Sequence, residues 1–329
     1  MLEVRDLQTS FRIDGKEAPV VDGVTFEVGK SEIVALVGES GCGKSVTALS
    51  IMNLIADPPG KIRSGRIIFE GEDLLERSEK QLRKIRGRRL SMIFQDPMMS
   101  LNPVQTIGRQ ISEAIEQHER LGRKQALERA QELLRLIGMP SSEYRISNYP
   151  HQLSGGMKQR VMIAMAISCN PCLIIADEPT TALDVTVQAQ IMDTMRHLRE
   201  SKGMAILLIT HDLGIVAEIA ERILVMYAGQ IVESASVLEL FTSPRHPYTK
   251  GLLTAVPRPD IIGNRLHAIK GTIPKPSDFL SGCRFHPRCE YAGRICMERK
   301  PLLRKVGDNH TIRCWAATEN YVWAGADCE

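Results

Sequence analysis

The residues best suited to chemistry form a glycine-rich loop, GESGCGKS, at residues 38–45. Glycines let successive backbone N–H groups converge on phosphate oxygens without a clashing side chain. The helix expected after the loop points its positive end at the same oxygens. Lys44 would contact the β- and γ-phosphates of a nucleotide, and Ser45 would donate its hydroxyl oxygen to Mg2+. The loop therefore predicts a nucleoside triphosphate site formed by Gly38, Ser40, Gly41, Gly43, Lys44 and Ser45.

Two adjacent acids, Asp177 and Glu178, follow the apolar run Leu173–Ala176. At the end of a buried strand, Asp177 can hold the metal through water. Glu178 can polarise an attacking water molecule. Two acids could instead mark a strand end that faces solvent, but the following Pro-Thr-Thr-Ala-Leu-Asp run disfavours this reading. The pair therefore predicts metal-assisted hydrolysis.

A second anion site is predicted where LSGGMKQR, residues 153–160, opens a helix. Ser154 is a favourable first residue for a helix, and the N–H groups of Gly155 and Gly156 are then directed outward. The spacing from Gly38 does not by itself say whose phosphate this site binds.

Alternating strands and helices are expected to position these groups. Residues 1–40 are predicted to form strands separated by turns, ending in the short buried strand Ile33–Val37. Residues from about 105 to 150 are expected to be helical. Within them, apolar residues at 127–137 follow a helical period, and Gly138 ends that helix. The remaining expected helices are 46–55, 162–167, 187–199 and 213–220, and the remaining strands are 65–71, 90–94, 173–176, 205–209 and 223–226. This alternation predicts an α/β fold with a mostly parallel sheet.

Composition limits the classes of function. Hydrophobic residues make up 43% and charged residues 25% of the 329 residues, as in ordinary globular proteins. A net charge of +3 is too small to indicate nucleic acid as the main partner. The opening MLEVRDLQTSFRID does not resemble a signal peptide, and the apolar runs are too short for a membrane span. We expect a soluble, cytoplasmic chain whose membrane role, if any, depends on a partner.

Beyond Ser243 the chain is rich in proline and cysteine, which predicts a loop-rich appendage with little core of its own. Its cysteines favour metal binding over disulfides. Four thiolates can hold an iron–sulfur cluster or tetrahedral zinc. His286 and His310 keep a mixed Cys/His zinc site open, and Cys328 has no assigned role. Five cysteines, Cys283, Cys289, Cys296, Cys314 and Cys328, lie in the last 47 residues.

The other cysteines lie near the predicted nucleotide site. Cys169 and Cys172 form a C-x-x-C pattern at a helix-to-strand turn, where small buried side chains are expected rather than a redox pair. Cys42 is expected at the N-terminus of a helix, which would acidify its thiol.

Residues 1 to about 240 resemble the ATP-binding cassette (ABC) ATPases, with the motifs in the family's order. Gln95 closes MIFQDP and looks like the Q-loop glutamine, and Ile209-Thr210-His211-Asp212 looks like the H-switch. The resemblance implies a RecA-like, mostly parallel sheet with an N-terminal antiparallel β part and a helical subdomain inserted at about 96–168. It also implies a nucleotide-binding domain at 1–242 and a C-terminal extension at 243–329.

The resemblance implies a role for each matching residue. Gln95 would sense the γ-phosphate and Mg2+, His211 would contact the γ-phosphate, and Phe11 would stack on adenine. Glu178, His211 and Gln95 would carry catalysis, while Ser45, Gln95 and Asp177 would hold Mg2+. A head-to-tail dimer is implied, with two ATP molecules bound at its interface. The signature residues that contact the opposite subunit's ATP would be Ser154, Gly155, Gly156 and Gln159. Asp184 would belong to the D-loop.

Residues 246–257 and 271–289, HPYTKGLLTAVP and GTIPKPSDFLSGCRFHPRC, resemble the ATPase subunits of bacterial oligopeptide and dipeptide importers. Membership of this peptide/nickel group implies a 4Fe-4S cluster on Cys283, Cys289, Cys296 and Cys314, which follow the spacing C-x5-C-x6-C-x17-C. It also implies a homologous second ATPase subunit or a homodimer, two membrane permeases and, indirectly, an extracellular solute-binding protein. The chain would lie at the cytoplasmic face of the inner membrane. A nickel or other solute importer, or a soluble ABC ATPase of DNA repair or translation, is the alternative.

Overall fold

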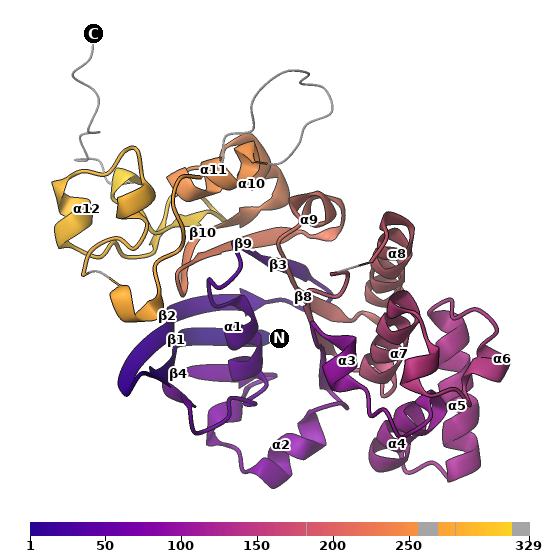
Figure 1. Cartoon of the computed structure of the whole chain (residues 1–329). Helices are drawn as coiled ribbons and strands as arrows, with labels where there is room; N and C mark the ends of the chain where they lie inside the picture. The colour runs from indigo at the N-terminus through magenta and orange to yellow at the C-terminus, as the bar shows by residue number, and fades with distance from the viewer. Residues whose placement is uncertain (182, 256–268, 280, 318–329) are drawn as a thin grey trace. The chain divides into compact units, whose positions relative to one another are not determined.

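The computed structural model describes residues 1–181, 183–255, 269–279 and 281–317, which form two compact units (Figure 1). The first unit contains Met1, residues 28–33 and residues 73–209. The second contains residues 2–27, residues 34–72 and the described residues from Thr210 onward. Each unit therefore combines segments that are far apart in the sequence.

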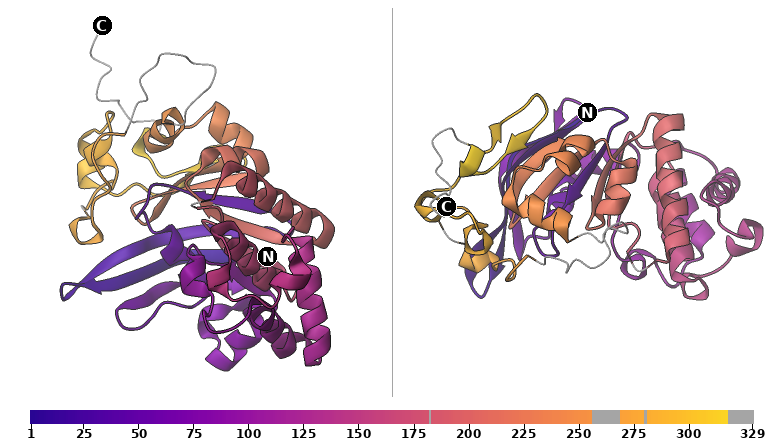
Figure 2. Two further views of the ribbon diagram at one scale, coloured as in Figure 1. Left: turned by 45° about the vertical axis from the view of Figure 1, so that its right-hand side comes forward. Right: turned by 90° about the horizontal axis from the view of Figure 1, so that it is seen from above.

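The second unit contains an antiparallel sheet with the strand order β2-β1-β4-β5. Alternate apolar residues such as Leu2 and Val4 are buried, as expected for strands with one covered face. Helix α1 (Lys44–Ile51) contacts this sheet through the Thr9 and Ser50 hydroxyls, 2.8 Å apart. Figure 2 shows the first two strands as a long hairpin. The strands are β1 (Leu2–Ile13), β2 (Lys16–Val28), β4 (Gly60–Phe69) and β5 (Glu72–Asp73).

The strand before the phosphate loop lies in another sheet of the second unit. In it β3 (Ile33–Val37) pairs in parallel with β9 (Arg222–Tyr227), and β9 pairs antiparallel with β10 (Gln230–Ser236). The C-terminal segment adds β12 (Thr311–Ile312) to β10 and β11 (Arg304–Lys305) to β12. The helices of this unit are α1, α9 (Leu213–Ile219), α10 (Val237–Thr242), α11 (Pro247–Thr254) and α12 (Arg294–Glu298).

The C-terminal segment shares its core with the rest of the second unit. Tyr248 and Phe285 pack in one buried cluster with Val225 of β9, and Cys283 and Cys289 lie against that cluster. In both views of Figure 2 the yellow C-terminal segment lies beside the orange helices. The expectation that this segment lacks an independent core agrees with this packing.

The first unit is built on three parallel strands, β6 (Leu90–Ile93), β7 (Leu173–Asp177) and β8 (Ala205–Thr210). Helices α4 and α5 pack together, and both contact α7. Figure 1 shows this helical group in magenta and purple. The helices are α2 (Glu79–Ile85), α3 (Pro97–Ser100), α4 (Ile107–Glu119), α5 (Arg123–Leu136), α6 (Ser142–Arg145), α7 (Gly155–Ile167) and α8 (Val185–Lys202).

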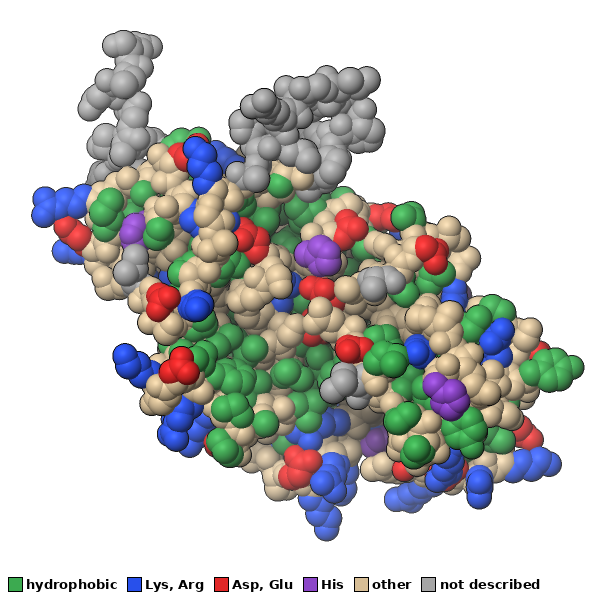
Figure 3. All heavy atoms as spheres, viewed as in Figure 1, with side chains coloured by type: hydrophobic (Ala, Val, Ile, Leu, Met, Phe, Trp, Pro, Cys, Tyr) green, Lys and Arg blue, Asp and Glu red, His purple; other side chains and the backbone are tan. Residues whose placement is uncertain are grey.

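Short 3-10 turns complete the described chain at Leu74–Glu76, Pro150–Gln152, Pro276–Asp278, His286–Arg288 and Trp315–Ala317. Among the described residues no helix combines the length and apolar character needed to cross a membrane. On the face shown in Figure 3, Lys and Arg side chains are interspersed with Asp and Glu rather than gathered in one patch.

One helix of the second unit has other bounds than expected, and two elements of that unit were not expected. The helix expected at 46–55 begins at Lys44 and ends at Ile51, because Asn53 adopts a positive φ of 49° that a helix cannot continue. Strand β10 and helix α11 were not expected from the sequence. Both are stabilised by the shared core of the second unit, which forms only when distant segments pack together.

Candidate nucleotide and metal sites

Glycine is required in the phosphate loop at positions where the chain turns sharply or packs closely. Gly41 and Gly43 have φ values of 80° and 108°, in the left-handed region that other residues rarely adopt. A Cβ atom on Gly38 would lie 2.2 Å from the Met226 carbonyl oxygen. The loop backbone therefore keeps its shape only with glycines at these positions.

Lys44 is folded onto the loop. Its ammonium group donates to the carbonyl oxygens of Gly38 and Glu39, at 2.9 and 3.1 Å. Its side chain is buried, whereas Ser40 and Gly41 are exposed. No side chain caps α1, so the N–H groups at its start are left for an anion. The loop thus has the charge and donors that a triphosphate requires.

His211 lines the same cavity as the phosphate loop. This cavity of about 460 Å3 lies within the second unit. Asp212 fixes the segment by accepting hydrogen bonds from the N–H groups of Gly214 and Ile215, at 2.8 and 3.3 Å. Phe11, on β1 opposite Gly60, is half-buried and lies outside this lining. The cavity is lined by Val37, Gly38, Glu39, His211, Asp212, Leu213, Leu252 and Ala255.

The first unit brings Gln95 and Glu178 together. The Gln95 amide nitrogen donates to Glu178 Oε2 at 3.1 Å, and the Thr181 hydroxyl donates to the same oxygen at 2.8 Å. Glu178 has a φ of 46°, an uncommon backbone state for a residue with a side chain. Asp177 is buried at the end of β7. The carboxylate of Glu178 is therefore held in a defined orientation just beyond the strand end.

The signature segment forms the start of α7, as the sequence predicts. The Ser154 hydroxyl accepts from the Met157 N–H at 3.4 Å and caps the helix, and Ser154 and Gly155 are exposed. A Cβ atom on Gly156 would lie 3.2 Å from the Val187 side chain. In the same unit Asp184 caps α8 by accepting from the Val187 N–H at 2.9 Å.

Gln159, the remaining residue of the predicted signature group, points inward. Only 3% of its surface is exposed, and its amide nitrogen has no hydrogen-bond partner within the described chain. Its predicted contact with a second subunit's nucleotide stays a prediction, as do the roles of the other signature residues.

The expectation of an acidified Cys42 is wrong. Cys42 is 1% exposed, and burial raises the pKa of its thiol in spite of the nearby Lys44. The thiol points into the protein interior, where the charged form is poorly solvated. Cys169 is buried, as expected, and Cys172 is half-buried; neither forms a disulfide. Cys328 lies outside the described residues.

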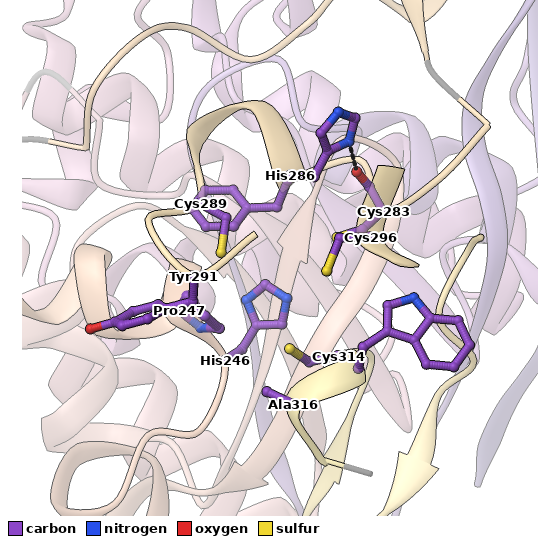
Figure 4. Close-up of a pocket in the computed structure, with 11 residues that line it drawn as sticks. His246, Pro247, Cys283, His286, Cys289, Tyr291, Cys296, Cys314 and Ala316 are labelled. Atoms are coloured by element: carbon purple, nitrogen blue, oxygen red, sulfur yellow. Dashed lines mark hydrogen bonds between the residues drawn. The ribbon is translucent and has the colours of Figure 1, made fainter. Parts of the chain in front are cut away.

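The four predicted ligand cysteines line one pocket of the second unit (Figure 4). In the close-up the sulfur atoms of Cys289, Cys296 and Cys314 point toward the space beside the His246 ring. The Cys283 N–H donates to the Cys296 carbonyl oxygen at 2.7 Å, which ties two of the four segments together. The lining is His246, Pro247, Cys283, Phe285, His286, Cys289, Tyr291, Cys296, Cys314, Trp315 and Ala316.

Burial favours the protonated form of three thiols of this pocket. It raises the pKa of Cys283 to about 12 and that of Cys314 to about 11, and it also raises the pKa of Cys289. A metal group bound here must therefore displace protons. Four thiols that line one pocket are, once deprotonated, the donor set of an iron–sulfur cluster or of zinc.

His286 and His310, the histidines of the alternative zinc site, have different surroundings. His310 is fully buried and its Nε2 lies 2.7 Å from Glu233 Oε1, so it is used away from the pocket. His286 Nδ1 lies 2.7 Å from the Cys283 carbonyl oxygen. His310 does not line the pocket, and a zinc site completed by it or by His286 stays a prediction. Within the described chain, no three Cys, His, Asp or Glu side chains meet closely enough to bind a single ion together.

His246 is a pocket residue that the sequence analysis missed. Its ring is buried among the thiols, and burial lowers its pKa to about 4, so it is neutral. Its Nδ1 accepts from the Tyr248 N–H at 3.0 Å. The motif HPY gave no metal-ligand spacing, so only the folded structure reveals this residue.

Comparison with known families identifies two regions of the chain. Residues 21–181 match the family described as ABC transporter, and residues 232–296 match the family described as oligopeptide/dipeptide transporter, C-terminal region. The oligopeptide transport ATP-binding protein AppD of Bacillus subtilis is 52% identical over 319 residues, covering 97% of each chain. The dipeptide transport ATP-binding protein DppD of the same organism is 46% identical, covering 96% of this chain and 94% of that protein.

Solved structures show the same fold. The ATP-binding cassette MJ0796, in a dimeric post-hydrolysis state bound to ADP and Pi, superposes with a TM-score of 0.66. The two share 26% identity, and the match covers 72% of this chain and 99% of that one. CbiO1 from Clostridium perfringens, part of the ABC transporter complex cbiONQ, gives a TM-score of 0.61 at 26% identity, covering 74% and 90% of the two chains.

Proposed function

This chain belongs to the ATP-binding subunits of oligopeptide and dipeptide ABC transporters, and from that premise we propose how its residues drive import. It is the ATPase motor of a peptide importer. The observation that carries the proposal is the cavity that joins His211 to the phosphate loop, together with the carboxylate of Glu178 held by Gln95.

We propose that the phosphate loop binds the ATP triphosphate and that Ser45, Gln95 and Asp177 hold Mg2+. Lys44 would exchange its present carbonyl partners for phosphate oxygens, because the anion is the stronger acceptor. Glu178 would orient and deprotonate the attacking water, and His211 would contact the γ-phosphate. Phe11 would stack on adenine. The cassette would occupy 1–242 and the C-terminal extension 243–329.

We propose a head-to-tail dimer in which the signature segment completes the ATP site of the other subunit. Ser154 and Gly155 are exposed at the start of a 13-residue helix, which is a favourable position for a partner's phosphate. The buried side chain of Gln159 would help to hold this helix against the rest of its unit. A homologous second ATPase subunit or a second copy of this chain would fill the partner role.

Ser154→Arg is expected to lower ATP turnover about tenfold or more and to leave the Kd for ATP within about twofold. Arginine removes the helix cap and occupies the space of the partner's γ-phosphate, but it leaves the phosphate loop of the same chain untouched. Steady-state hydrolysis and fluorescent-ATP titration measure the two effects. Thr106→Arg is the control, because Thr106 caps α4 with a bond of the same 3.4 Å length outside the signature. Equal losses in both variants would contradict the dimer geometry.

We propose that Cys283, Cys289, Cys296 and Cys314 hold a 4Fe-4S cluster that stabilises the C-terminal extension. A cluster binds each thiolate at a different iron atom, whereas one zinc ion needs all its ligands within about 2.3 Å. The four thiols line one space, and their C-x5-C-x6-C-x17-C spacing lacks the C-x2-C pairs usual for zinc, which favours the cluster. When bound, the group would supply folding energy, since ATP hydrolysis needs no electron transfer.

We propose that two permeases anchor the chain at the cytoplasmic face of the inner membrane and that an extracellular binding protein delivers the substrate. The test is reconstitution of the chain with its permeases in ATP-loaded vesicles. A short peptide with its binding protein should stimulate hydrolysis. Stimulation by Ni2+ alone would favour the nickel importer of the same group. ATP hydrolysis that needs no permeases and responds neither to peptide nor to Ni2+ would contradict the coupling of hydrolysis to transport.

A further inference from the structure

Arg288 connects the cysteine pocket to the phosphate loop. It precedes Cys289, and its Nη1 donates to Glu39 Oε2 at 3.0 Å. The side chain of Arg288 is 6% exposed and that of Glu39 is 29% exposed, so the pair is partly shielded from water. Glu39 is the second residue of the loop GESGCGKS. The contact thus spans 249 residues of sequence between the two sites.

The guanidinium of Arg288 is fixed by several further acceptors. Its Nε donates to the Lys270 carbonyl oxygen at 2.8 Å, and its Nη2 donates to the carbonyl oxygens of Ile269 and Gly271, each at 3.3 Å. A planar group held on several sides has little freedom to follow Glu39 if the loop moves. The loop must therefore follow the arginine.

The backbone of Glu39 is held from the same region. Its N–H donates to the Tyr248 hydroxyl at 2.9 Å, and Tyr248 is fully buried. The rings of Tyr248 and Phe285 lie 5.4 Å apart, and Phe285 stands between Cys283 and Cys289 in the chain. The Arg288 N–H donates to the Phe285 carbonyl oxygen at 3.0 Å. The hydrogen bonds of Glu39 to Arg288 and to Tyr248 thus both depend on the segment that carries the cysteines.

The position of Glu39 matters for nucleotide binding because Glu39 lies between Gly38 and Ser40 in the phosphate loop, whose backbone N–H groups would receive the phosphates. On the other side, Gly38 is packed against Met226, so the loop is fixed there by contact. The exposed residues Ser40 and Gly41 follow Glu39 directly. Glu39 is therefore the loop residue through which side chains from outside the loop, Arg288 and Tyr248, can position the phosphate loop.

We propose that Arg288 is a positioning residue for the phosphate loop and that the folded cysteine segment fixes it, so that the state of the cysteine pocket sets the affinity for ATP. This inference rests on the proposed ATPase function. It assigns the C-terminal extension a role in nucleotide binding in addition to its own stability.

Arg288→Met is expected to raise the Kd for a fluorescent ATP analogue about tenfold, because a partly buried charged hydrogen bond is lost. The kcat at saturating ATP should stay within about twofold, since Arg288 contacts no reacting atom. Glu39→Gln should weaken binding in the same direction, and the double variant should add little, because both changes remove the same ion pair. Arg288→Lys should restore only part of the affinity.

Arg313→Met is the matched control. Arg313 also adjoins a pocket cysteine and is 9% exposed, but its guanidinium donates to the carbonyl oxygens of Ile231, Pro301 and Gly23. Its loss should weaken the tail and leave the Kd for ATP within about twofold. Equal weakening by Arg313→Met and Arg288→Met would overturn the proposal, because general loosening would then explain both.

Removal of the pocket's ligands supplies the second test. Cys289→Ser should raise the Kd about as much as Arg288→Met does, and combining the two changes should have little additional effect. Hydrogen exchange at residues 38–45 should rise in both variants and not in Arg313→Met. If Arg288→Met leaves the Kd for ATP unchanged while Lys44→Ala abolishes ATP binding, this inference is refuted and the proposed function is not. Failure of the wild-type chain to bind ATP would instead refute the proposed function.

Discussion

Glu178→Gln protein is expected to hydrolyse ATP at least about 100-fold more slowly than the wild-type chain while binding ATP with nearly the same affinity. The amide oxygen can still accept from Gln95 and Thr181, so the local geometry is retained. The amide cannot take a proton from the attacking water. With turnover blocked, ATP should accumulate in a closed dimer, which size-exclusion chromatography with ATP and Mg2+ would detect.

Lys44→Ala is the contrasting variant for this experiment. Lys44 carries the buried charge of the phosphate loop, and its loss should weaken ATP binding itself and give no ATP-dependent dimer. Turnover close to the wild-type rate in purified Glu178→Gln protein would show that another group activates water. Loss of ATP binding in that variant would show that Glu178 holds the substrate.

Protein purified without oxygen is expected to be brown and to contain about four iron atoms per chain. Cys289→Ser should lose most of this iron, because one of the four thiolates that line the pocket is removed. The described tail, residues 281–317, should then exchange amide hydrogens faster and be cleaved more readily by protease, since the cluster's folding energy is lost. Iron analysis, absorbance and hydrogen exchange measure these changes.

Cys172→Ser is the matched control, because Cys172 is a half-buried cysteine of the first unit that forms no disulfide. Its iron content and tail protection should equal those of the wild-type chain. A colourless anaerobic protein with one tightly bound zinc would refute the cluster and keep the idea of a metal staple. Metal-free protein with a protected tail would refute both.

The sequence predicted the loops at the nucleotide site well, because their chemistry is local. Gly41 and Gly43 need positive φ values that are nearly restricted to glycine, and the short apolar runs Ile33–Val37 and Leu173–Ala176 are long enough only for buried strands. The prediction for Cys42 failed, because the start of a helix was read from the sequence and the burial of the thiol was not.

The tail shows why spacing alone was insufficient there. The cysteine pattern indicated a metal site, but the sequence could not tell that His310 is bound to Glu233 or that His246 lies among the thiols. Each of these contacts joins segments that only the shared core brings together. Histidine has several structural uses, so its type and position in sequence do not select one.

The sequence by itself determined which residues have the chemistry for ATP, for Mg2+ and for a thiolate-bound group, since residue type and local spacing set the available donors and charges. Only the tertiary structure decided which of these groups meet. Arg288 reaches Glu39 because β9 and β10 join the strand before the phosphate loop to β12 of the C-terminal segment in one sheet. Pairing of distant strands depends on the whole core, and no local sequence pattern records it.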